Sequence, residues 1–122
     1  MKSVLIVDDN VTILKLYELF LRSSGFSIID KAKNGDEAVN SYKLMSIKPD
    51  LIIMDHKMPI KNGIEALKEI LAIDKQAKII IMSADRRIEY IAKSVGAILF
   101  MEKPFLMETL LENINNILDI CS

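Results

Sequence analysis

The sequence has no tryptophan, a single cysteine, three prolines and four glycines among 122 residues. The one cysteine, Cys121, cannot form an internal disulfide, so the chain is expected to fold in a reducing compartment. No apolar run approaches the roughly 18 residues that a membrane-spanning helix needs. No leader-like segment precedes the first apolar run, which begins at Val4. These absences argue against a secreted disulfide scaffold and a membrane protein, and they predict a cytoplasmic location.

Neither sign of charge predominates in the composition. Sixteen basic residues against 17 acidic ones leave a formal net charge of -1, which gives no electrostatic reason to expect nucleic-acid or membrane binding. With 51% hydrophobic and 27% charged residues, the composition is that of an ordinary globular domain. A chain of this length can bury one hydrophobic core without disulfides. We therefore expect a single domain over residues 1–122, with no linker or repeat.

Short apolar runs recur along the whole chain. They cover residues 4–7, 26–29, 51–54, 79–82 and 97–100. Four of them are continuous rather than alternating, which is typical of parallel strands buried on both faces. The run at residues 26–29 is more mixed and is predicted to lie at an edge of the sheet.

Residues with helical spacing fill the intervals between the apolar runs. The predicted helices cover residues 11–24, 36–46, 64–71, 88–95 and 107–118. Gly25 and Gly96 fall where helices should stop, Asn34 and Gly35 mark a turn, and Pro104 is predicted in the first turn of the last helix. This alternation predicts an α/β fold with a doubly wound, flavodoxin-like parallel sheet. Its five strands are expected in the order 2-1-3-4-5, with five helices on both faces.

Polar side chains follow four of the five predicted strands. Asp8 and Asp9 follow the first run, Asp55 the third and Ser83 the fourth, and Lys103 comes shortly after the fifth. In an open parallel sheet, binding sites form outside the carboxyl ends of the strands. Each residue alone has an ordinary explanation, such as a helix cap or a surface lysine. Five such residues at one edge of one sheet indicate a functional site.

These residue types suit phosphoryl transfer beside a divalent metal ion. Mg²⁺ prefers oxygen ligands, and an ion between Asp8, Asp9 and Asp55 would relieve their mutual repulsion. An aspartate carboxylate can attack phosphorus. The ammonium group of Lys103 can neutralise charge on the phosphoryl oxygens, and the Ser83 hydroxyl can donate a hydrogen bond to one of them. The sequence therefore predicts that Asp55 accepts a phosphoryl group beside Mg²⁺ (or Mn²⁺) held partly by Asp8 and Asp9.

The same residues lie in stretches that closely resemble the receiver domain of two-component response regulators. The matching stretches are residues 4–10, 55–59, 62–63, 81–84 and 103–105, and the likeness runs from about residue 2 to the end. The chain resembles single-domain regulators of the chemotaxis type, and its charge and helix faces do not separate these from sporulation-type phosphorelay intermediates, which are also single receivers. The resemblance implies that Asp55 is the phosphoacceptor and that the backbone carbonyl of Lys57 is a further metal ligand. It also implies that Ser83 and Lys103 contact the phosphoryl group.

The resemblance further implies a conformational switch. Phe100 stands at the position of the family's aromatic switch residue. Ser83 is expected to move toward a phosphoryl oxygen and to let Phe100 turn inward, although Phe100 can also be read as a core residue only. The face of the fourth helix, fifth strand and fifth helix would then change for an output protein. Candidate contact residues on the fourth helix are Arg86, Arg87, Glu89, Tyr90 and Lys93.

Three residues near the acceptor are less usual for such a domain. His56, the only histidine, is expected to pack away from the site, because neighbouring residues of an extended segment point to opposite sides. Lys57 and Asp85 occupy positions that influence the lifetime of the phosphoryl group in the family. Their opposite charges predict an ion pair or near-pair across the mouth of the site. Such a pair would hinder the attacking water and slow dephosphorylation.

The leading hypothesis is a stand-alone receiver that accepts phosphoryl from a phosphohistidine and signals by binding an output protein. The donor would be a sensor histidine kinase or a histidine phosphotransfer protein. The chain would assist its own phosphorylation and dephosphorylation without being an enzyme for a separate substrate. The alternative is a receiver excised from a longer regulator with a DNA-binding or enzymatic output domain. The kinase, the output partner, the pathway and the oligomeric state are left open.

Two further classes of function are disfavoured. A metal-dependent phosphohydrolase would need a second aspartate two residues after the nucleophile as general acid, and Lys57 stands there. A phosphorylation-independent binding module would have no need of the intact set of acidic residues and lysine.

Overall fold

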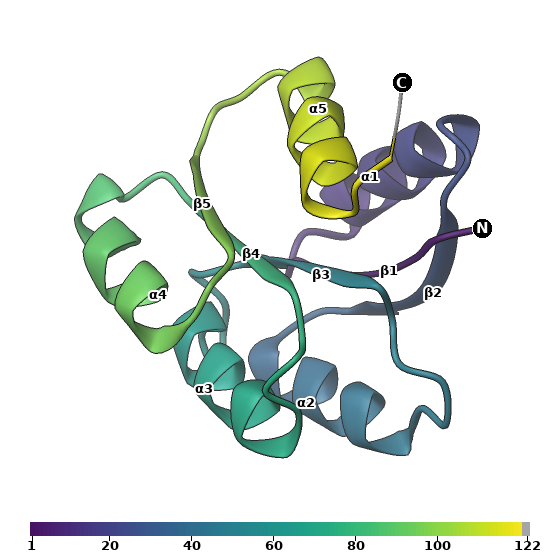
Figure 1. Ribbon diagram of the computed structural model, residues 1–122. Coiled ribbons are helices and arrows are strands. Elements are labelled where there is room, and N and C mark those ends of the chain that lie inside the picture. Colours follow the sequence, from purple (N-terminus) through teal and green to yellow (C-terminus); the bar gives the residue numbers. More distant parts are fainter. Residues whose placement is uncertain (121–122) are drawn as a thin grey trace.

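The computed structural model describes residues 1–120, in which five strands alternate with five α-helices (Figure 1). The strands are β1 (Ser3–Val7), β2 (Ser27–Ala32), β3 (Leu51–Asp55), β4 (Ile79–Ser83) and β5 (Leu99–Glu102). The helices are α1 (Val11–Ser23), α2 (Gly35–Leu44), α3 (Gly63–Ile73), α4 (Glu89–Val95) and α5 (Met107–Ile117), and a 3-10 turn, η1 (Arg86–Ile88), precedes α4. Cys121 lies outside the described residues.

The strands form one parallel sheet in the order β2-β1-β3-β4-β5. This confirms the predicted doubly wound topology, and it places the more mixed run in the edge strand β2. Every residue of β3 and β4 is buried, because helices cover both faces of these central strands. The continuous apolar runs in the sequence reflect that two-sided burial. The edge strand β2 instead exposes residues 29–31.

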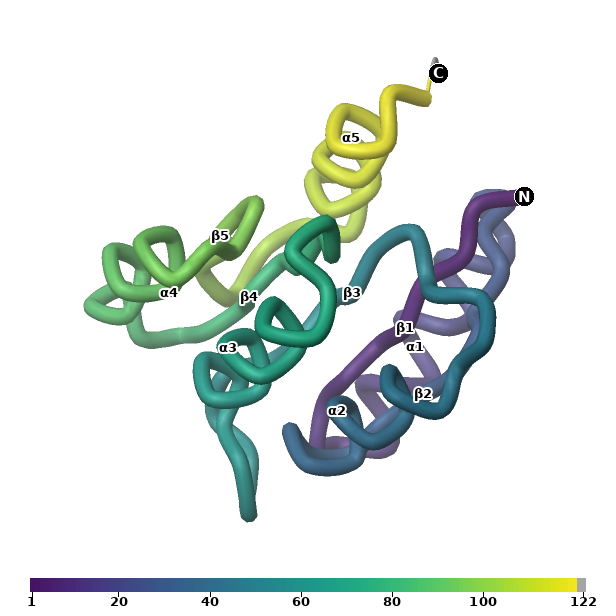
Figure 2. The backbone as a smooth tube through the Cα atoms, turned by 60° about the horizontal axis from the view of Figure 1, so that its bottom comes forward, coloured from purple at the N-terminus to yellow at the C-terminus, as the bar shows by residue number. Residues whose placement is uncertain are grey.

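Three helices cover one face of the sheet and two cover the other (Figure 1). On the first face, α2, α3 and α4 contribute Ala38, Leu67 and Ala92 to the core, and Figure 2 shows α3 lying between α2 and α4. On the second face, α1 and α5 contribute Leu14 and Leu110. Helices on both faces were predicted and are confirmed. Within residues 1–120, no helix combines the length and the apolar character that crossing a bilayer requires.

Most of the predicted helix ends are correct. Gly25 follows α1 and Gly96 follows α4, with φ angles of 96° and 129°, in a region that residues with a side chain rarely adopt. Asn34 caps α2, since its side-chain oxygen accepts a hydrogen bond from the Glu37 N–H at 2.8 Å.

The placement of Pro104 in the first turn of the last helix is wrong. α5 begins at Met107, and Pro104 lies in the segment that connects it to β5. The reason is that β5 extends beyond the predicted apolar run. Its pairing with β4 continues as far as Lys103, whose N–H donates to the Ser83 carbonyl at 2.9 Å. The connection therefore starts later in the chain.

The start of α3 packs directly against the end of β3. A Cβ atom at Gly63 would lie 2.6 Å from the carbonyl oxygen of Asp55 and 2.9 Å from the Cα of His56. The Gly63 N–H donates to the His56 carbonyl at 2.9 Å, and Asn62 and Glu65 form a capping box. These contacts fasten α3 to the segment that carries Asp55.

We expect Gly63→Ala to lower the free energy of unfolding by about 3 kcal/mol, because backbone atoms cannot rotate away from the new methyl group. Gly25→Ala is the matched control, since its Cβ would meet nothing within 4 Å and only its positive φ is strained. That strain costs roughly 1 kcal/mol. Urea unfolding of the two variants measures the difference. Equal losses would contradict the close approach of α3 to β3.

Candidate functional site

The segments that follow four strands meet at the carboxyl edge of the sheet. Asp55 is the last residue of β3 and Ser83 the last of β4, while Asp8 follows β1 and Lys103 follows β5. Asp9, Asp55, Ser83 and Lys103 line one hollow of about 1020 Å³. The Lys103 ammonium connects Asp8 to this group, at 3.6 Å from its Oδ2. The structure therefore brings together all five residues that the sequence places at this edge.

Three carboxylates lie close together in the hollow. Ligand oxygens of Asp8, Asp9 and Asp55 are all within 4.8 Å of one another. Asp8 and Asp55 are buried, whereas Asp9 is exposed. The Oδ1 atom of Asp8 accepts a hydrogen bond from the Asn10 N–H at 2.9 Å, but its buried Oδ2 has no hydrogen-bond partner. A set of carboxylate oxygens in which one buried oxygen accepts no hydrogen bond fits a hard divalent cation such as Mg²⁺.

Lys103 is the basic group of the cluster. Its Nζ lies 3.0 Å from Oδ1 of Asp55 as well as near Asp8. The pairing of its backbone with Ser83 sets the position of this side chain relative to β4. One ammonium group cannot neutralise three carboxylates, so the hollow keeps a negative charge that attracts a cation.

Burial raises the pKa of Asp8 above the ordinary aspartate value of 3.8. The charge of Asp55 adds to this effect, while the hydrogen bond from Asn10 and the charge of Lys103 oppose it. A raised pKa means that the folded chain disfavours the ionised form of Asp8. The cluster therefore costs folding free energy at neutral pH unless a cation balances it.

Ser83 is buried, and its Oγ accepts a hydrogen bond from the Asp85 N–H at 3.0 Å. The alternative reading of Ser83 as the cap of the following helix is not supported. Asp85 fills that role, since its Oδ1 accepts from the Arg87 N–H at 3.0 Å. Among residues 1–120, no acceptor takes the hydroxyl proton of Ser83, and that proton is free to be donated to an oxygen in the hollow.

The expected ion pair between Lys57 and Asp85 is not formed. The Asp85 carboxylate instead binds the Arg87 guanidinium through two hydrogen bonds of 2.9 and 3.0 Å, which hold the pKa of Asp85 below its usual range. Arg87 lies two residues along the chain, on the turn that Asp85 caps, so its planar guanidinium group can bind the carboxylate through both hydrogen bonds. An acidic cap followed by arginine was the sequence signal for this pair, and it was missed. Lys57, Asp85 and Arg87 all line the hollow.

His56 only partly follows the expectation that it packs away from the site. Its ring nitrogen Nδ1 accepts a long hydrogen bond of 3.4 Å from the Ile64 N–H in α3, but the residue also borders the hollow. Burial lowers the pKa of His56, so the neutral ring is favoured.

Phe100 lies at the end of the predicted fifth run, inside β5. It is only 8% exposed and belongs to the core cluster on the α4 face, together with Ala92 and Ala97. Little of its ring is left to bury by an inward turn. On α4 itself, Tyr90 is 84% exposed, and Lys93 pairs with Glu89 at 2.9 Å.

Several known proteins are similar to this chain. A family model described as "Response regulator receiver domain" matches residues 4–115. The chemotaxis protein CheY of Bacillus subtilis is 42% identical over 118 residues, which cover 95% of this chain and 97% of that protein. CheY of Thermotoga maritima is 39% identical over 118 residues, with the same coverage. A solved CheX–CheY–BeF₃–Mg²⁺ complex from Borrelia burgdorferi matches with a TM-score of 0.90 and 35% identity, over 95% of this chain and 88% of that chain.

With divalent metal chelated, we expect Asp8→Asn to raise the free energy of unfolding at neutral pH by on the order of 1 kcal/mol. The amide keeps the hydrogen bond from Asn10 and removes a buried charge. Since the folded pKa of Asp8 is raised, the cost of its ionised form is complete above that pKa and disappears below 3.8. The gain should therefore shrink as the pH falls toward that value in urea unfolding experiments.

The exposed neighbour provides the control for this experiment, because Asp9→Asn should change the stability little. Added Mg²⁺ should stabilise the unmodified chain but not Asp8→Asn. An Asp8→Asn variant that is less stable than the unmodified chain in EDTA would contradict the explanation from buried charge.

Proposed function

This chain belongs to the family of response regulator receiver domains, and we propose that its Asp55 accepts a phosphoryl group from a phosphohistidine. The donor is a sensor histidine kinase or a histidine phosphotransfer protein, and the domain covers residues 1–122. The observation that carries the proposal is the Lys103–Asp55 contact of 3.0 Å within the acidic cluster. Receiver domains serve phosphorylation-switched signalling rather than turnover of a separate substrate. A donor of this kind implies that the domain acts in the cytoplasm.

Asp55 is the nucleophile of the transfer. A carboxylate oxygen of Asp55 forms the new P–O bond while the P–N bond to the donor imidazole breaks, and the bonding pair leaves with the imidazole. The Lys103 ammonium lies where it can balance charge on the phosphoryl oxygens. The Ser83 hydroxyl is free to donate to one of these oxygens. An ionised carboxylate attacks without giving up a proton, so the step requires no general base.

Asp8, Asp9 and Asp55 would hold Mg²⁺ (or Mn²⁺), with the backbone carbonyl of Lys57 as a further ligand. The buried Oδ2 of Asp8, which accepts no hydrogen bond, and the close spacing of the three carboxylates support this assignment. When bound, the ion would supply positive charge to both the acidic cluster and the incoming phosphoryl oxygens. Asp8 is held in position by its hydrogen bond from Asn10.

The signal leaves the site through the end of β4. Ser83 accepts the hydrogen bond from the Asp85 N–H, and Asp85 caps the turn that leads into α4. A movement of Ser83 toward a phosphoryl oxygen would therefore loosen the start of α4. Phe100 lies in the core beneath this helix and would adjust with it. The resulting change reaches an output protein on the face made by α4, β5 and α5, where Tyr90 is exposed.

Incubation with acetyl phosphate and Mg²⁺ should add one phosphoryl group to the intact mass of the chain. The adduct should be absent in Asp55→Asn and when EDTA replaces Mg²⁺, because the nucleophile or the balancing charge is then missing. Asp36→Asn, an exposed aspartate on α2, is the control and should be labelled normally. A phosphoryl adduct that persists in Asp55→Asn would refute Asp55 as the acceptor.

We expect Lys57→Ala to speed the loss of the phosphoryl group several-fold. Lys57 and the Asp85–Arg87 pair both line the hollow, and removing the lysine side chain clears a path for the attacking water. Lys68→Ala, at an exposed lysine on α3, is the control. The decay of the phosphorylated chain after removal of acetyl phosphate gives the rate. An unchanged or slower decay in Lys57→Ala would show that this side chain does not hinder the water.

A further inference from the structure

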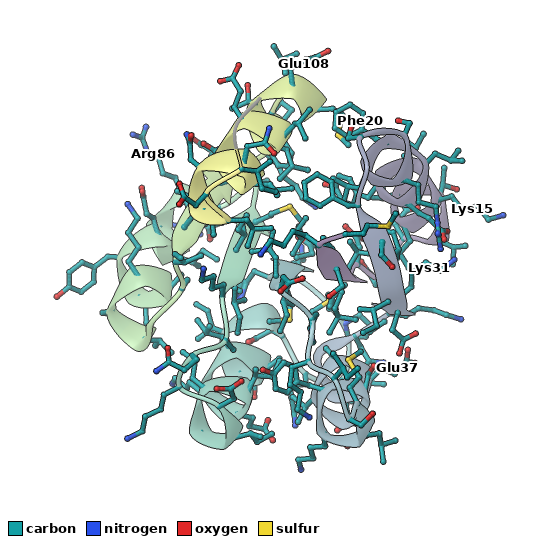
Figure 3. All side chains as sticks on the ribbon, turned by 45° about the vertical axis from the view of Figure 1, so that its right-hand side comes forward. Lys15, Phe20, Lys31, Glu37, Arg86 and Glu108 are labelled. Atoms are coloured by element: carbon teal, nitrogen blue, oxygen red, sulfur yellow. The ribbon has the colours of Figure 1, made fainter. Side chains whose placement is uncertain are left out.

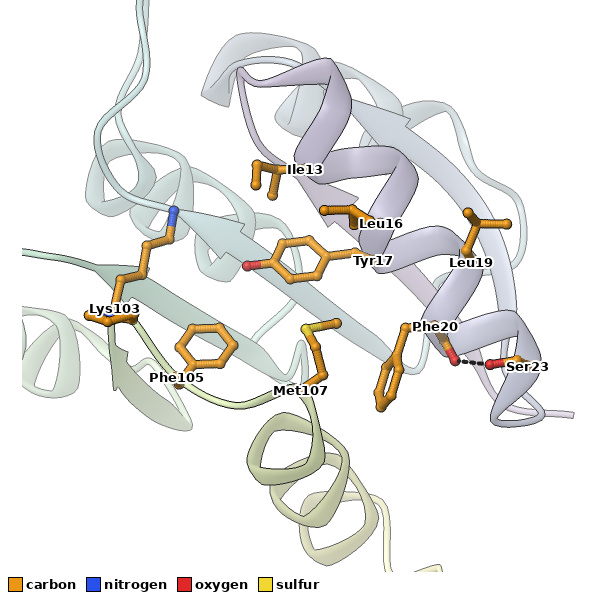
Figure 4. A pocket seen from close by; sticks show the side chains of 10 residues that line it. Ile13, Leu16, Tyr17, Leu19, Phe20, Ser23, Lys103, Phe105 and Met107 are labelled. Carbon is orange, nitrogen blue, oxygen red and sulfur yellow. Dashed lines mark hydrogen bonds between the residues drawn. The ribbon is translucent and has the colours of Figure 1, made fainter.

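The acidic hollow has a neighbour on the face of the sheet that carries only two helices. This neighbour is a groove of about 630 Å³ between α1 and the segment that leads into α5. Figure 4 shows Tyr17 and Phe20 projecting from α1 toward Phe105 and Met107. Lys103 lines both the groove and the acidic hollow. Neither is lined by residues 1–2, 43–50 or 73–78, which form a third region at the other end of the strands.

Charge is distributed unevenly along the direction of the strands. The segments 1–2, 43–50 and 73–78 precede β1, β3 and β4, so they lie together at the amino edge of the parallel sheet. The opposite, carboxyl edge holds the three clustered carboxylates. The net charge of -1 for the whole chain averages these two ends and conceals the difference. We call the three segments the basic edge, because they contain five lysines: Lys2, Lys43, Lys48, Lys75 and Lys78.

The lysines of the basic edge are not neutralised by their surroundings. None of the five forms an ion pair with any residue of 1–120. The two aspartates in the same segments are engaged in internal hydrogen bonds. Oδ2 of Asp50 accepts from the Ser3 N–H at 2.8 Å, and Oδ2 of Asp74 accepts from the Tyr42 hydroxyl at 2.6 Å. Five lysines and two aspartates leave these side chains with a formal charge of +3.

Two exposed aliphatic side chains stand among these lysines. Leu44, the last residue of α2, is 86% exposed, and Ile47 in the turn that follows is 78% exposed. Met45 between them packs against the core on the α2 face, so the core is served without Leu44 and Ile47. Lys43 and Lys48 flank the pair in the sequence. Exposed apolar side chains set between cations are suited to the boundary between water and a charged lipid surface.

Contacts between α2 and α3 hold this arrangement together. The two helices lie side by side (Figures 1 and 2), and the hydrogen bond from Tyr42 to Asp74 joins the end of one to the segment after the other. Lys75, which follows Asp74, therefore lies near Lys43, which follows Tyr42. The Lys48 ammonium donates to the Tyr42 carbonyl and lies 4.7 Å from the centre of the Tyr42 ring. The lysines and the two aliphatic side chains thus form one surface.

We propose that the basic edge binds the surface of a membrane that contains anionic lipids. The lysine ammonium groups contact the phosphate groups of the lipid head groups, while Leu44 and Ile47 enter the boundary between head groups and acyl chains. The same surface repels the acidic cluster at the opposite edge. Attraction at one edge and repulsion at the other favour a single orientation, in which Asp55 faces away from the membrane and stays open to a phosphoryl donor.

A lipid surface suits this edge better than a protein partner does. Leu44 and Ile47 project from a helix end and a turn, and no residue of the edge lines either hollow. A protein would need a pocket shaped for both side chains, whereas lipids rearrange around any protruding side chain. The binding does not involve Asp55, so Asp55→Asn should bind as the unmodified chain does. Failure of this proposal would leave the role of Asp55 as phosphoacceptor untouched.

The full chain should sediment with vesicles of equal parts phosphatidylcholine and phosphatidylglycerol, but not with phosphatidylcholine alone, and added salt should weaken the binding. Lys43→Gln combined with Lys75→Gln should weaken it by about tenfold or more. Lys15→Gln combined with Lys33→Gln is the control, since it removes the same charge at two exposed positions outside the basic edge; Lys15 projects outward from α1 (Figure 3). Equal losses in the two double variants would overturn the proposal. A chain that ignores the anionic vesicles would overturn it in favour of an acidic protein partner.

A tryptophan reporter tests the orientation, because the chain has no tryptophan of its own. With the anionic vesicles, the fluorescence emission of Ile47→Trp should shift to shorter wavelength, since the indole ring leaves water. Leu16→Trp is the control, because Leu16 is 55% exposed on α1, outside the basic edge, and its emission should stay unchanged. Circular dichroism checks that both variants are folded. An unshifted emission from vesicle-bound Ile47→Trp, or an equal shift in Leu16→Trp, would overturn the proposal.

Discussion

The burial of carboxylates at the end of a parallel sheet is the constraint on which the rest of this structure depends. Asp8 and Asp55 are buried beside each other, and Oδ2 of Asp8 has no hydrogen-bond partner. Such an arrangement costs free energy, so the surrounding fold has to hold it in place. The fully buried strands β3 and β4 stabilise the fold through the apolar surface that they remove from water. The close packing of Gly63 against the Asp55 carbonyl restricts the loop that follows β3. The negative charge of this cluster is what attracts a cation.

Lys103 connects three parts of the molecule: the β4–β5 pair, the acidic cluster and the groove beside α1. Its backbone continues the β4–β5 pairing, its ammonium contacts Asp55, and its side chain lines the groove between α1 and α5. Ser83 makes a comparable connection on the other side, because its hydroxyl holds the N–H of Asp85 at the start of the segment leading into α4. These contacts give a change of charge at Asp55 two routes by which it could reach neighbouring surfaces, one through Lys103 and one through the end of β4.

The fold was largely predictable from the sequence because its signals are local. Continuous apolar runs, helical spacing and helix-ending glycines each depend on a few adjacent residues. The errors arose where pairing between strands or competition between side chains decided the outcome. Pro104 was predicted inside the last helix, but it lies in the connection before that helix. The apolar pattern does not reveal that the pairing of β4 with β5 continues to Lys103. Lys57 was predicted as the partner of Asp85, but the Arg87 guanidinium, only two residues along the chain, binds the Asp85 carboxylate instead.

The sequence by itself determined which residues arrive at the carboxyl edge, since the alternation of strands and helices places Asp8, Asp55 and Ser83 after parallel strands. Tertiary structure alone decided which carboxylate oxygen is left without a partner, how Lys103 divides its contacts, and where the face with two helices leaves a groove. The physical reason is distance. The periodicity of apolar residues reflects structure within a few adjacent residues. Charge pairs and cavities depend instead on how side chains from distant segments pack together.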